Sequence, residues 1–302
     1  MIFYLFLITF LFKYCNGYYF KSPQKVYDLI CSRVFLNRIL VDYNECNKDL
    51  STGELTVSLP NDDERALHIR NILKLAINDK IRMGIINHGL TEGVVTSINN
   101  AYNISLGLYD KLIKSNDTPY VDLILAVPRP LRLERILPVI ASLGIRRLYL
   151  IAANKVEKDY FGSHLFRRPS ELNKLLLEGL SQSSNDYILP EIHVRKNFQK
   201  FVMDELPILY SDGCGYNKFI AHPYNIENMN NSVKRLFHYD KNNRSTNNAV
   251  VAIGPEGGWE DDEVICFIQN NFQQITLGDH ILRTDVAVTV ILGMIDEWLN
   301  IK

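Results

Sequence analysis

The sequence predicts an α/β protein in which a small β-barrel precedes a domain with a mostly parallel sheet. From residue 118 onward, strand-like and helix-like patterns alternate, which is typical of parallel sheets joined by crossover helices. Before residue 115, short runs alternate apolar and polar residues with a period of two, which favours a small barrel. The chain has 302 residues, of which 47% are hydrophobic, so it is long enough for two such domains.

The first residues differ from the rest of the chain. Residues 2–12 form an apolar run in which Thr9 is the one polar residue, and Cys15, Asn16 and Gly17 follow closely. A membrane-spanning helix needs about 20 residues, so this run is too short for one. Its length is typical of the apolar part of a signal peptide, although no basic residues precede it. We therefore expect residues 1–28 to be a targeting leader, with a membrane anchor as the alternative.

Residues 29–114 are expected to form the barrel. Its predicted strands lie at 32–36, 54–59, 80–85, 92–98 and 102–106. Residues 62–73 are predicted to form one helix, because acidic residues open the segment and apolar residues recur along it.

Residues 118–302 are expected to form the α/β domain. Its predicted strands lie at 121–127, 147–152, 191–195, 218–221, 249–253 and 275–277. Its predicted helices lie at 131–143, 171–183, 198–210 and 286–298, and a further helix begins after Trp259. The polar stretch 225–248 is expected to be a surface loop.

Two turns near the C-terminus are the best candidate for a ligand site. Gly254-Pro255-Glu256-Gly257-Gly258 follows one predicted strand and precedes an acidic helix start. Residues 277–285 follow the next predicted strand and lead into the last helix. Such strand-to-helix turns present backbone N–H and C=O groups to a small polar ligand. The glycine turn matches neither the dinucleotide fingerprint nor the P-loop.

Taken together, the two turns resemble the paired motifs of the small-subunit ribosomal RNA uridine-N3 methyltransferases, which belong to the SPOUT class. The second motif comprises Leu277-Gly278 and residues 281–284. Residues 32–36 and 68–73 are similar to the family's N-terminal PUA-like domain, and weaker motifs match between 143 and 192. The chain departs from the family pattern at 139–144, at Ser181 and at Asp285.

The resemblance implies a domain with a trefoil knot that holds S-adenosylmethionine in a bent shape among the knot loops. It implies methylation of N3 of a specific uridine in small-subunit ribosomal RNA, either free or in the small ribosomal subunit, without a metal. SPOUT enzymes act as homodimers with the site at the subunit boundary, and the apolar last helix is a candidate for that interface. A non-catalytic RNA-binding or ribosome-assembly factor with the same fold is one alternative. A SPOUT enzyme that methylates another RNA base is the other.

The site residues follow from the resemblance and from the chemistry. Uracil N3 must lose its proton, so a carboxylate base or a cation that stabilises the anion would help. The expected catalytic residues are Arg283 and Glu256, followed by Asp285. An Arg283–Asp285 ion pair and a structural hydrogen bond of Glu256 inside its turn are the alternatives. The expected cofactor-binding residues are Gly254, Pro255, Glu256, Gly257, Gly258, Leu277, Gly278, Ile281, Leu282 and Arg283. The expected RNA-binding residues are Arg33, His68, Arg70, Arg129 and Arg132.

Charge and cysteine usage limit the partners. The net charge of −1 excludes a uniformly basic surface, so any RNA-binding charge must be local. The five cysteines contain no Cys-x-x-Cys pair, so neither a disulfide framework nor a zinc site is predicted. A leader on an RNA-modifying enzyme favours a plastid-like organelle reached by the secretory route, with mitochondrion or cytoplasm as alternatives. No stable membrane association is expected after leader removal.

Overall fold

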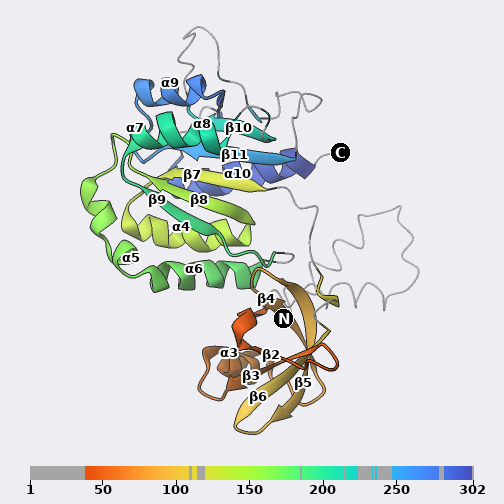
Figure 1. Ribbon diagram of the computed structural model, residues 1–302. Helices are drawn as coiled ribbons and strands as arrows, with labels where there is room; N and C mark the ends of the chain where they lie inside the picture. Colours follow the sequence, from red (N-terminus) through yellow and green to blue (C-terminus); the bar gives the residue numbers. More distant parts are fainter. Residues whose placement is uncertain are drawn as a thin grey trace, which may run out of the picture. The chain divides into compact units, whose positions relative to one another are not determined.

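The fold consists of two six-stranded sheets that share no strand (Figure 1). The computed structural model describes residues 38–108, 111–113, 120–183, 186–211, 213, 215–223, 233, 235–236, 247–278 and 282–300. The predicted leader, the first predicted strand and Arg33 lie outside these residues. The predicted domain boundary between 114 and 118 falls between the two sheets and stays a prediction.

The N-terminal sheet has the strand order β1-β4-β5-β6-β3-β2. The strands are β1 (Ile39–Val41), β2 (Cys46–Lys48), β3 (Glu54–Pro60), β4 (Lys80–Ile85), β5 (Gly89–Ile98) and β6 (Ala101–Leu108). The β1–β4 pair is parallel, and the other pairs are antiparallel. Among the described strands β1 and β2 do not pair with each other, so this sheet is an open half-barrel. The strands predicted at 54–59, 80–85, 92–98 and 102–106 are confirmed.

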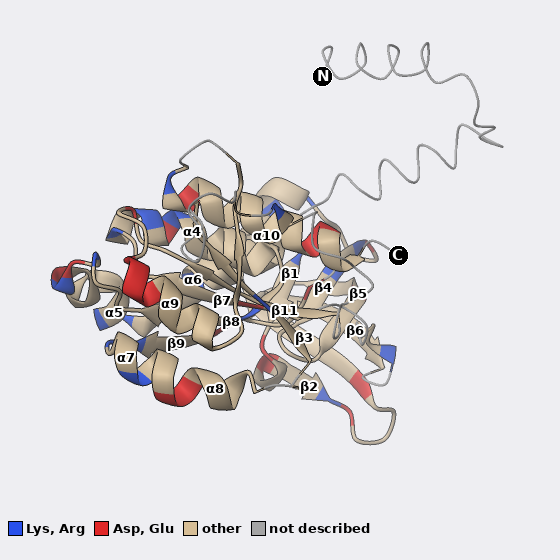
Figure 2. Cartoon of the chain, turned by 90° about the horizontal axis from the view of Figure 1, so that it is seen from above, with Lys and Arg blue, Asp and Glu red and all other residues tan. Residues whose placement is uncertain are grey.

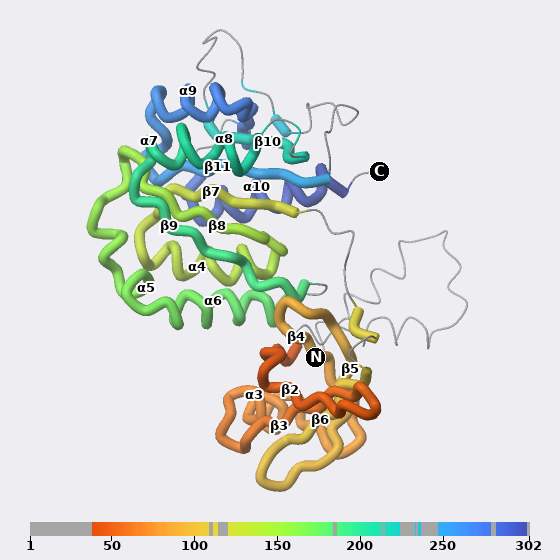
Figure 3. Tube along the Cα trace, in the orientation of Figure 1, coloured from red at the N-terminus to blue at the C-terminus, as the bar shows by residue number. Residues whose placement is uncertain are grey.

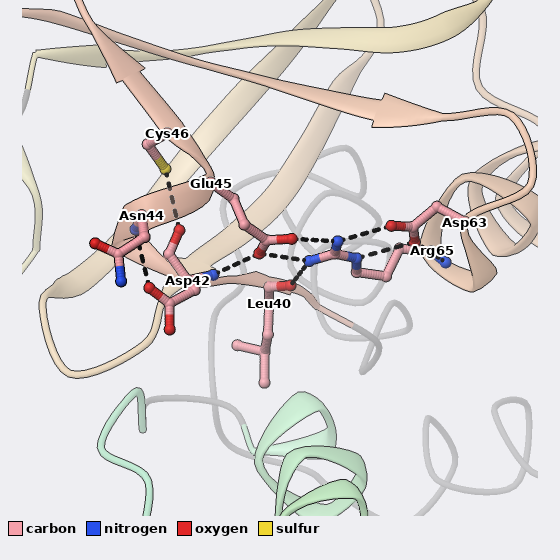
Figure 4. A network of polar contacts seen from close by, with 7 residues as sticks. All are labelled: Leu40, Asp42, Asn44, Glu45, Cys46, Asp63 and Arg65. Atoms are coloured by element: carbon pink, nitrogen blue, oxygen red, sulfur yellow. Dashed lines mark hydrogen bonds and ion pairs between the residues drawn. The ribbon is translucent and has the colours of Figure 1, made fainter. Parts of the chain in front are cut away.

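One polar network fixes the helix of this half-barrel. The segment predicted as one helix forms α3 (Glu64–His68) and continues as a π-helical turn, η2 (Ile69–Leu73). The Arg65 guanidinium lies 2.6 Å from a Glu45 carboxylate oxygen and 2.7 Å from one of Asp63, and it also donates to the Leu40 carbonyl (Figure 4). Hydrogen bonds to Glu45 and Asp63 raise the pKa of Arg65. The network joins the start of α3 to β1 and to the short helix η1 (Tyr43–Glu45).

The C-terminal sheet is entirely parallel, in the order β12-β10-β11-β7-β8-β9. The strands are β7 (Val121–Ala126), β8 (Ile145–Ile151), β9 (Glu191–Arg195), β10 (Tyr216–Ala221), β11 (Asn248–Ile253) and β12 (Gln273–Ile275). The predicted α/β class is therefore confirmed. The strand predicted at 275–277 was placed wrongly, because β12 ends at Ile275 and the next two residues belong to the turn. Strands β7 and β11, far apart in the sequence, lie side by side (Figure 3).

Helices cover both faces of this sheet. They are α4 (Pro130–Ser142), α5 (His164–Arg167), α6 (Pro169–Gln182), α7 (Phe198–Lys200), α8 (Leu206–Leu209), α9 (Asp261–Gln269) and α10 (Thr284–Asn300), with η4 (Lys158–Gly162) before α5 and a π-helical turn, η5 (Phe201–Glu205), between α7 and α8. Figure 2 shows α4 and α10 on one face of the sheet and α7 and α8 on the other. Their apolar sides and the strands enclose one core. None of the described helices is long and apolar enough to cross a membrane.

A buried ion pair lies inside the parallel sheet. Asp122 on β7 is fully buried, and its Oδ2 lies 2.7 Å from a guanidinium nitrogen of Arg147 on β8. The same oxygen accepts a hydrogen bond of 2.8 Å from the Tyr210 hydroxyl. Burial raises the pKa of Tyr210, so this hydroxyl remains a donor at neutral pH.

Removing the cation of this pair is expected to destabilise the fold. Arg147→Met leaves the Asp122 carboxylate buried without its charge partner, and we expect the free energy of unfolding to fall by about 2 kcal/mol. This value lies below the range for a fully buried pair, because the Arg147 side chain is 22% exposed. Urea denaturation measures the change.

The neighbouring arginine provides a matched control. Arg146 lies over the ring of Tyr120, 4.2 Å from the ring centroid, in a cation–π contact. Arg146→Met is therefore expected to change the unfolding free energy by less than about 1 kcal/mol. Equal stability losses in the two variants would contradict the role assigned to the buried pair.

Candidate functional site

A pocket of about 160 Å³ lies at the carboxyl edge of the parallel sheet, beside the ends of β10, β11 and β12. Parallel strands end at the same edge, so the loops that follow them gather there. The walls come from the loops after these three strands and from the first turns of α10. The structure thus brings together the two turns that sequence analysis identified as the candidate ligand site. Their strands, β11 and β12, lie on either side of β10.

Most of the predicted cofactor-binding residues line this pocket. They are Gly254, Pro255, Glu256, Gly258, Leu277, Gly278 and Leu282. Two others, Gly257 and Arg283, are not among its lining residues. Ile281 lies outside the described residues, and so does the path of residues 279–281, on which the implied trefoil knot depends. The knot therefore stays a prediction.

Glu256 joins the glycine turn to the neighbouring strand-to-helix loop. Its Oε1 accepts a hydrogen bond of 3.2 Å from the backbone N–H of Arg129 and one of 3.1 Å from the Arg132 guanidinium. Arg129 and Arg132 stand at the N-terminus of α4, where a carboxylate is favourable. The alternative expected for Glu256, a hydrogen bond inside its own turn, is wrong, since these bonds reach α4. Its catalytic role stays a prediction.

Two glycines of the first turn allow neighbouring side chains to pack closely. A Cβ atom on Gly254 would lie only 3.1–3.3 Å from three atoms of the Trp259 indole. A Cβ atom on Gly257 would lie 3.0 Å from Cδ of Lys155, away from the pocket. The glycine requirement at these positions therefore comes in part from the protein's own packing.

Trp259 is a wall residue that sequence reasoning did not assign. It is 3% exposed, and its ring centroid lies 5.3 Å from that of Phe267. Among the described residues the indole Nε1–H has no hydrogen-bond partner, although the atom is buried. An unsatisfied buried donor costs about 1–3 kcal/mol, so an acceptor on a bound ligand would stabilise it. The one sequence feature that could have identified Trp259 as a wall residue is its position directly after the glycine turn, between a strand and a helix.

The loop after β10 is a second contribution that the sequence did not reveal. His222 lines the pocket, and its backbone N–H donates to the Ile275 carbonyl at 3.0 Å, which joins the loops after β10 and β12. Burial lowers the pKa of His222, so its imidazole is neutral at neutral pH. Sequence analysis did not place His222 among the site residues.

Arg283 and Asp285 lie at the rim. The Arg283 Nη2 lies 3.2 Å from Oδ2 of Asp285, and the Arg283 side chain is 63% exposed. The ion pair considered as the alternative is therefore present. The residues on either side of Arg283, Leu282 and Thr284, line the pocket, so the guanidinium belongs to a segment that borders it. The catalytic roles of Arg283 and Asp285 stay predictions.

The remaining predicted contacts lie elsewhere. Arg70 donates to Asn61 at 2.5 Å and lies over the Tyr102 ring, 5.7 Å from its centroid. His68, in α3, is half-buried, and its RNA contact and that of Arg70 stay predictions. On α10, Val286 and Val290 are 38% and 39% exposed, and the predicted homodimer also stays a prediction. Within the described part of the chain, no three His, Cys, Asp or Glu side chains gather as metal ligands would.

Comparisons with known proteins agree with this arrangement. A family model described as RNA methyltransferase domain matches residues 115–296. The chain is 27% identical over 256 residues to ribosomal RNA small subunit methyltransferase E 1 of Borreliella burgdorferi, covering 83% of this chain and 94% of the relative. It is 26% identical over 241 residues to ribosomal RNA small subunit methyltransferase E of Treponema pallidum, covering 78% and 85%.

A solved structure shares the fold. It is a ribosomal RNA small subunit methyltransferase E from Neisseria gonorrhoeae, determined with bound S-adenosyl methionine. The TM-score is 0.63 at 18% sequence identity, and the match covers 86% of this chain and 97% of that chain. The match spans both sheets, so the half-barrel and the parallel sheet occur together in that protein as they do here.

Proposed function

The chain belongs to the RNA methyltransferase domain family, and from this premise we propose that it transfers a methyl group from S-adenosylmethionine to N3 of a uridine in small-subunit ribosomal RNA. The relatives in Borreliella burgdorferi and Treponema pallidum, which it matches over most of their length, are named ribosomal RNA small subunit methyltransferases. The observation that carries the proposal is the convergence of the glycine turn and the turn after β12 on one pocket.

The pocket fits the proposed cofactor. Its glycine turns let a ligand approach the backbone closely, and its walls are mainly apolar. The buried indole N–H of Trp259 lacks a partner among the described residues and belongs to a residue of the pocket wall, so we assign it as a donor to a ligand nitrogen or oxygen. Backbone groups around Gly254, Leu277 and Gly278 would hold the adenosyl and amino-acid ends.

The proposed chemistry needs few side chains. When bound, S-adenosylmethionine supplies an activated methyl group on a sulfonium, so the protein must mainly position the uracil ring against it. Removal of the N3 proton leaves negative charge on the ring, and the rim guanidinium of Arg283 is the group that we assign to stabilise it. Glu256 keeps α4 in register with the glycine turn through its bonds to Arg129 and Arg132.

Replacing the indole tests the fit of the cofactor. Trp259→Phe keeps an aromatic ring against Phe267 but removes the N–H donor. We expect the dissociation constant for S-adenosylmethionine to rise about fivefold to tenfold, the effect of one lost hydrogen bond. Isothermal titration calorimetry on the full chain measures this constant.

The second tryptophan provides the control. Trp298 is also buried, but it packs against Phe219 and does not line the pocket. Trp298→Phe should therefore leave cofactor affinity within about twofold. Equal losses in both variants would mean that the indole of Trp259 acts through packing only. If the wild-type chain has no affinity for S-adenosylmethionine, the proposed enzymatic function is rejected. The alternative, a non-catalytic RNA-binding factor, would then remain.

A further inference from the structure

A short segment of the long polar stretch 225–248 returns to the pocket. The sequence predicts a surface loop there, but Val233 and Leu236 are only 8% and 1% exposed, so the prediction is wrong for these two residues. Leu236 belongs to the main core and lines a small cavity together with Leu277 and Met294. This contact anchors the segment directly beside the turn after β12.

The anchored segment holds Arg235 over that turn. Arg235 is exposed, and a Cβ atom placed on Gly278 would lie 3.0 Å from its Nη2 and 3.5 Å from its Cζ. Gly278 has a φ of +106° and its N–H donates to Thr276 Oγ1 at 3.2 Å, so the turn is tight. The guanidinium therefore lies against a residue of the pocket wall.

The charges around the pocket distinguish Arg235 from its neighbours. Glu256 is the only Asp, Glu, Lys or Arg among the described lining residues, and Arg132 already pairs with it. The other titratable lining residue, His222, has a pKa lowered by burial and is neutral. Arg283 pairs with Asp285. Within the described part of the chain, no ion pair or hydrogen bond engages the Arg235 guanidinium. A positive charge thus lies against a wall residue of a pocket that has no Lys or Arg among its described lining residues.

We propose that Arg235 binds a backbone phosphate of the substrate RNA and so positions the nucleotide whose base enters the pocket. The inference rests on the proposed function. An arginine fork matches the geometry of a phosphate and is weakly hydrated, so it binds such a group well at an exposed rim. The carboxylate of the cofactor is the competing anion. Arg235 is exposed and is not a lining residue of the pocket, so its position favours the RNA phosphate over the cofactor carboxylate.

Direct binding measurements on the full chain test the proposal. The probes are a labelled in vitro transcript of small-subunit ribosomal RNA and S-adenosylmethionine alone. Arg235→Ala should weaken RNA binding about tenfold and reduce the slope of log affinity against log salt by about 0.7–1. The dissociation constant of S-adenosylmethionine should stay unchanged, and Arg235→Lys should recover part of the RNA affinity.

Arg168→Ala is the matched control, since the Arg168 side chain is 70% exposed and does not border the pocket. Its RNA affinity should equal that of the wild type. Unchanged RNA affinity in Arg235→Ala would overturn the inference, and so would a loss confined to S-adenosylmethionine binding. A wild-type chain that binds no RNA would instead reject the proposed function, and this inference with it.

Discussion

Arg283→Ala is expected to reduce methyl transfer by about 100-fold to 1,000-fold, the usual loss when one group that stabilises developing charge is removed. The fold should survive, because the Arg283 side chain is 63% exposed, so its ion pair with the less exposed Asp285 is open to solvent on one side. Single-turnover kinetics with saturating RNA measure the rate. Calorimetry should give an affinity for S-adenosylmethionine within about threefold of the wild type.

A purely structural Arg283 would behave differently. If it served only to pair with Asp285, its loss would cost roughly 1 kcal/mol of stability and leave the rate nearly unchanged. Asp285→Asn should then have the same effect as Arg283→Ala. Arg195, the last residue of the edge strand β9, pairs with Glu205 at 2.6 Å, and β9 is the edge strand opposite β12. Arg195→Ala therefore measures how loss of an ordinary ion pair changes the rate.

The second large effect is expected at the first glycine turn. A Cβ atom on Gly254 already approaches the Trp259 indole to 3.1 Å, and valine adds two more methyl groups. The indole cannot easily move away, since Phe198 and Phe267 pack against it. Gly254→Val should therefore fill or distort the pocket and weaken S-adenosylmethionine binding at least about 100-fold.

A glycine in open surroundings is the control for this substitution. A Cβ atom on Gly293, in α10, meets no other atom within 4 Å. Gly293→Ala should leave cofactor affinity unchanged and stabilise the helix by about 0.5–1 kcal/mol. Thermal melting of both variants shows whether the Gly254 substitution acts on the pocket or on the whole fold. Cofactor affinity retained in Gly254→Val would contradict the location of the site.

The fold was largely predictable because its patterns are local. The strands Lys80–Ile85 and Glu191–Arg195 were predicted with the correct bounds, since their apolar residues alternate or cluster between clear turn residues. β12 was misplaced by two residues, because the apolar Leu277 follows Ile275 and only sheet pairing shows where the strand ends. Burial of Leu236 was not predicted, because polar residues dominate the stretch 225–248 and the sequence does not show that Leu236 packs beside Leu277.

The sequence predicted the two turns of the site, but it did not predict all the residues that line the pocket. The glycine turn and the turn after β12 carry recognisable motifs, and the structure brings both to one pocket. His222 could not be assigned, because the sequence does not show that β10 lies between β11 and β12. The bonds of Glu256 to α4 depend on the β7–β11 pairing, which joins segments more than 120 residues apart.

The most direct test of the proposed activity is nucleoside mass spectrometry of small-subunit ribosomal RNA incubated with the purified full chain and S-adenosylmethionine. We expect N3-methyluridine to form, to depend on S-adenosylmethionine, and to be lost with Arg283→Ala and Gly254→Val. Methylation of another base would contradict the assignment to uridine N3. If a chain that binds S-adenosylmethionine forms no methylated nucleoside in either free RNA or small subunits, the proposed substrate is contradicted.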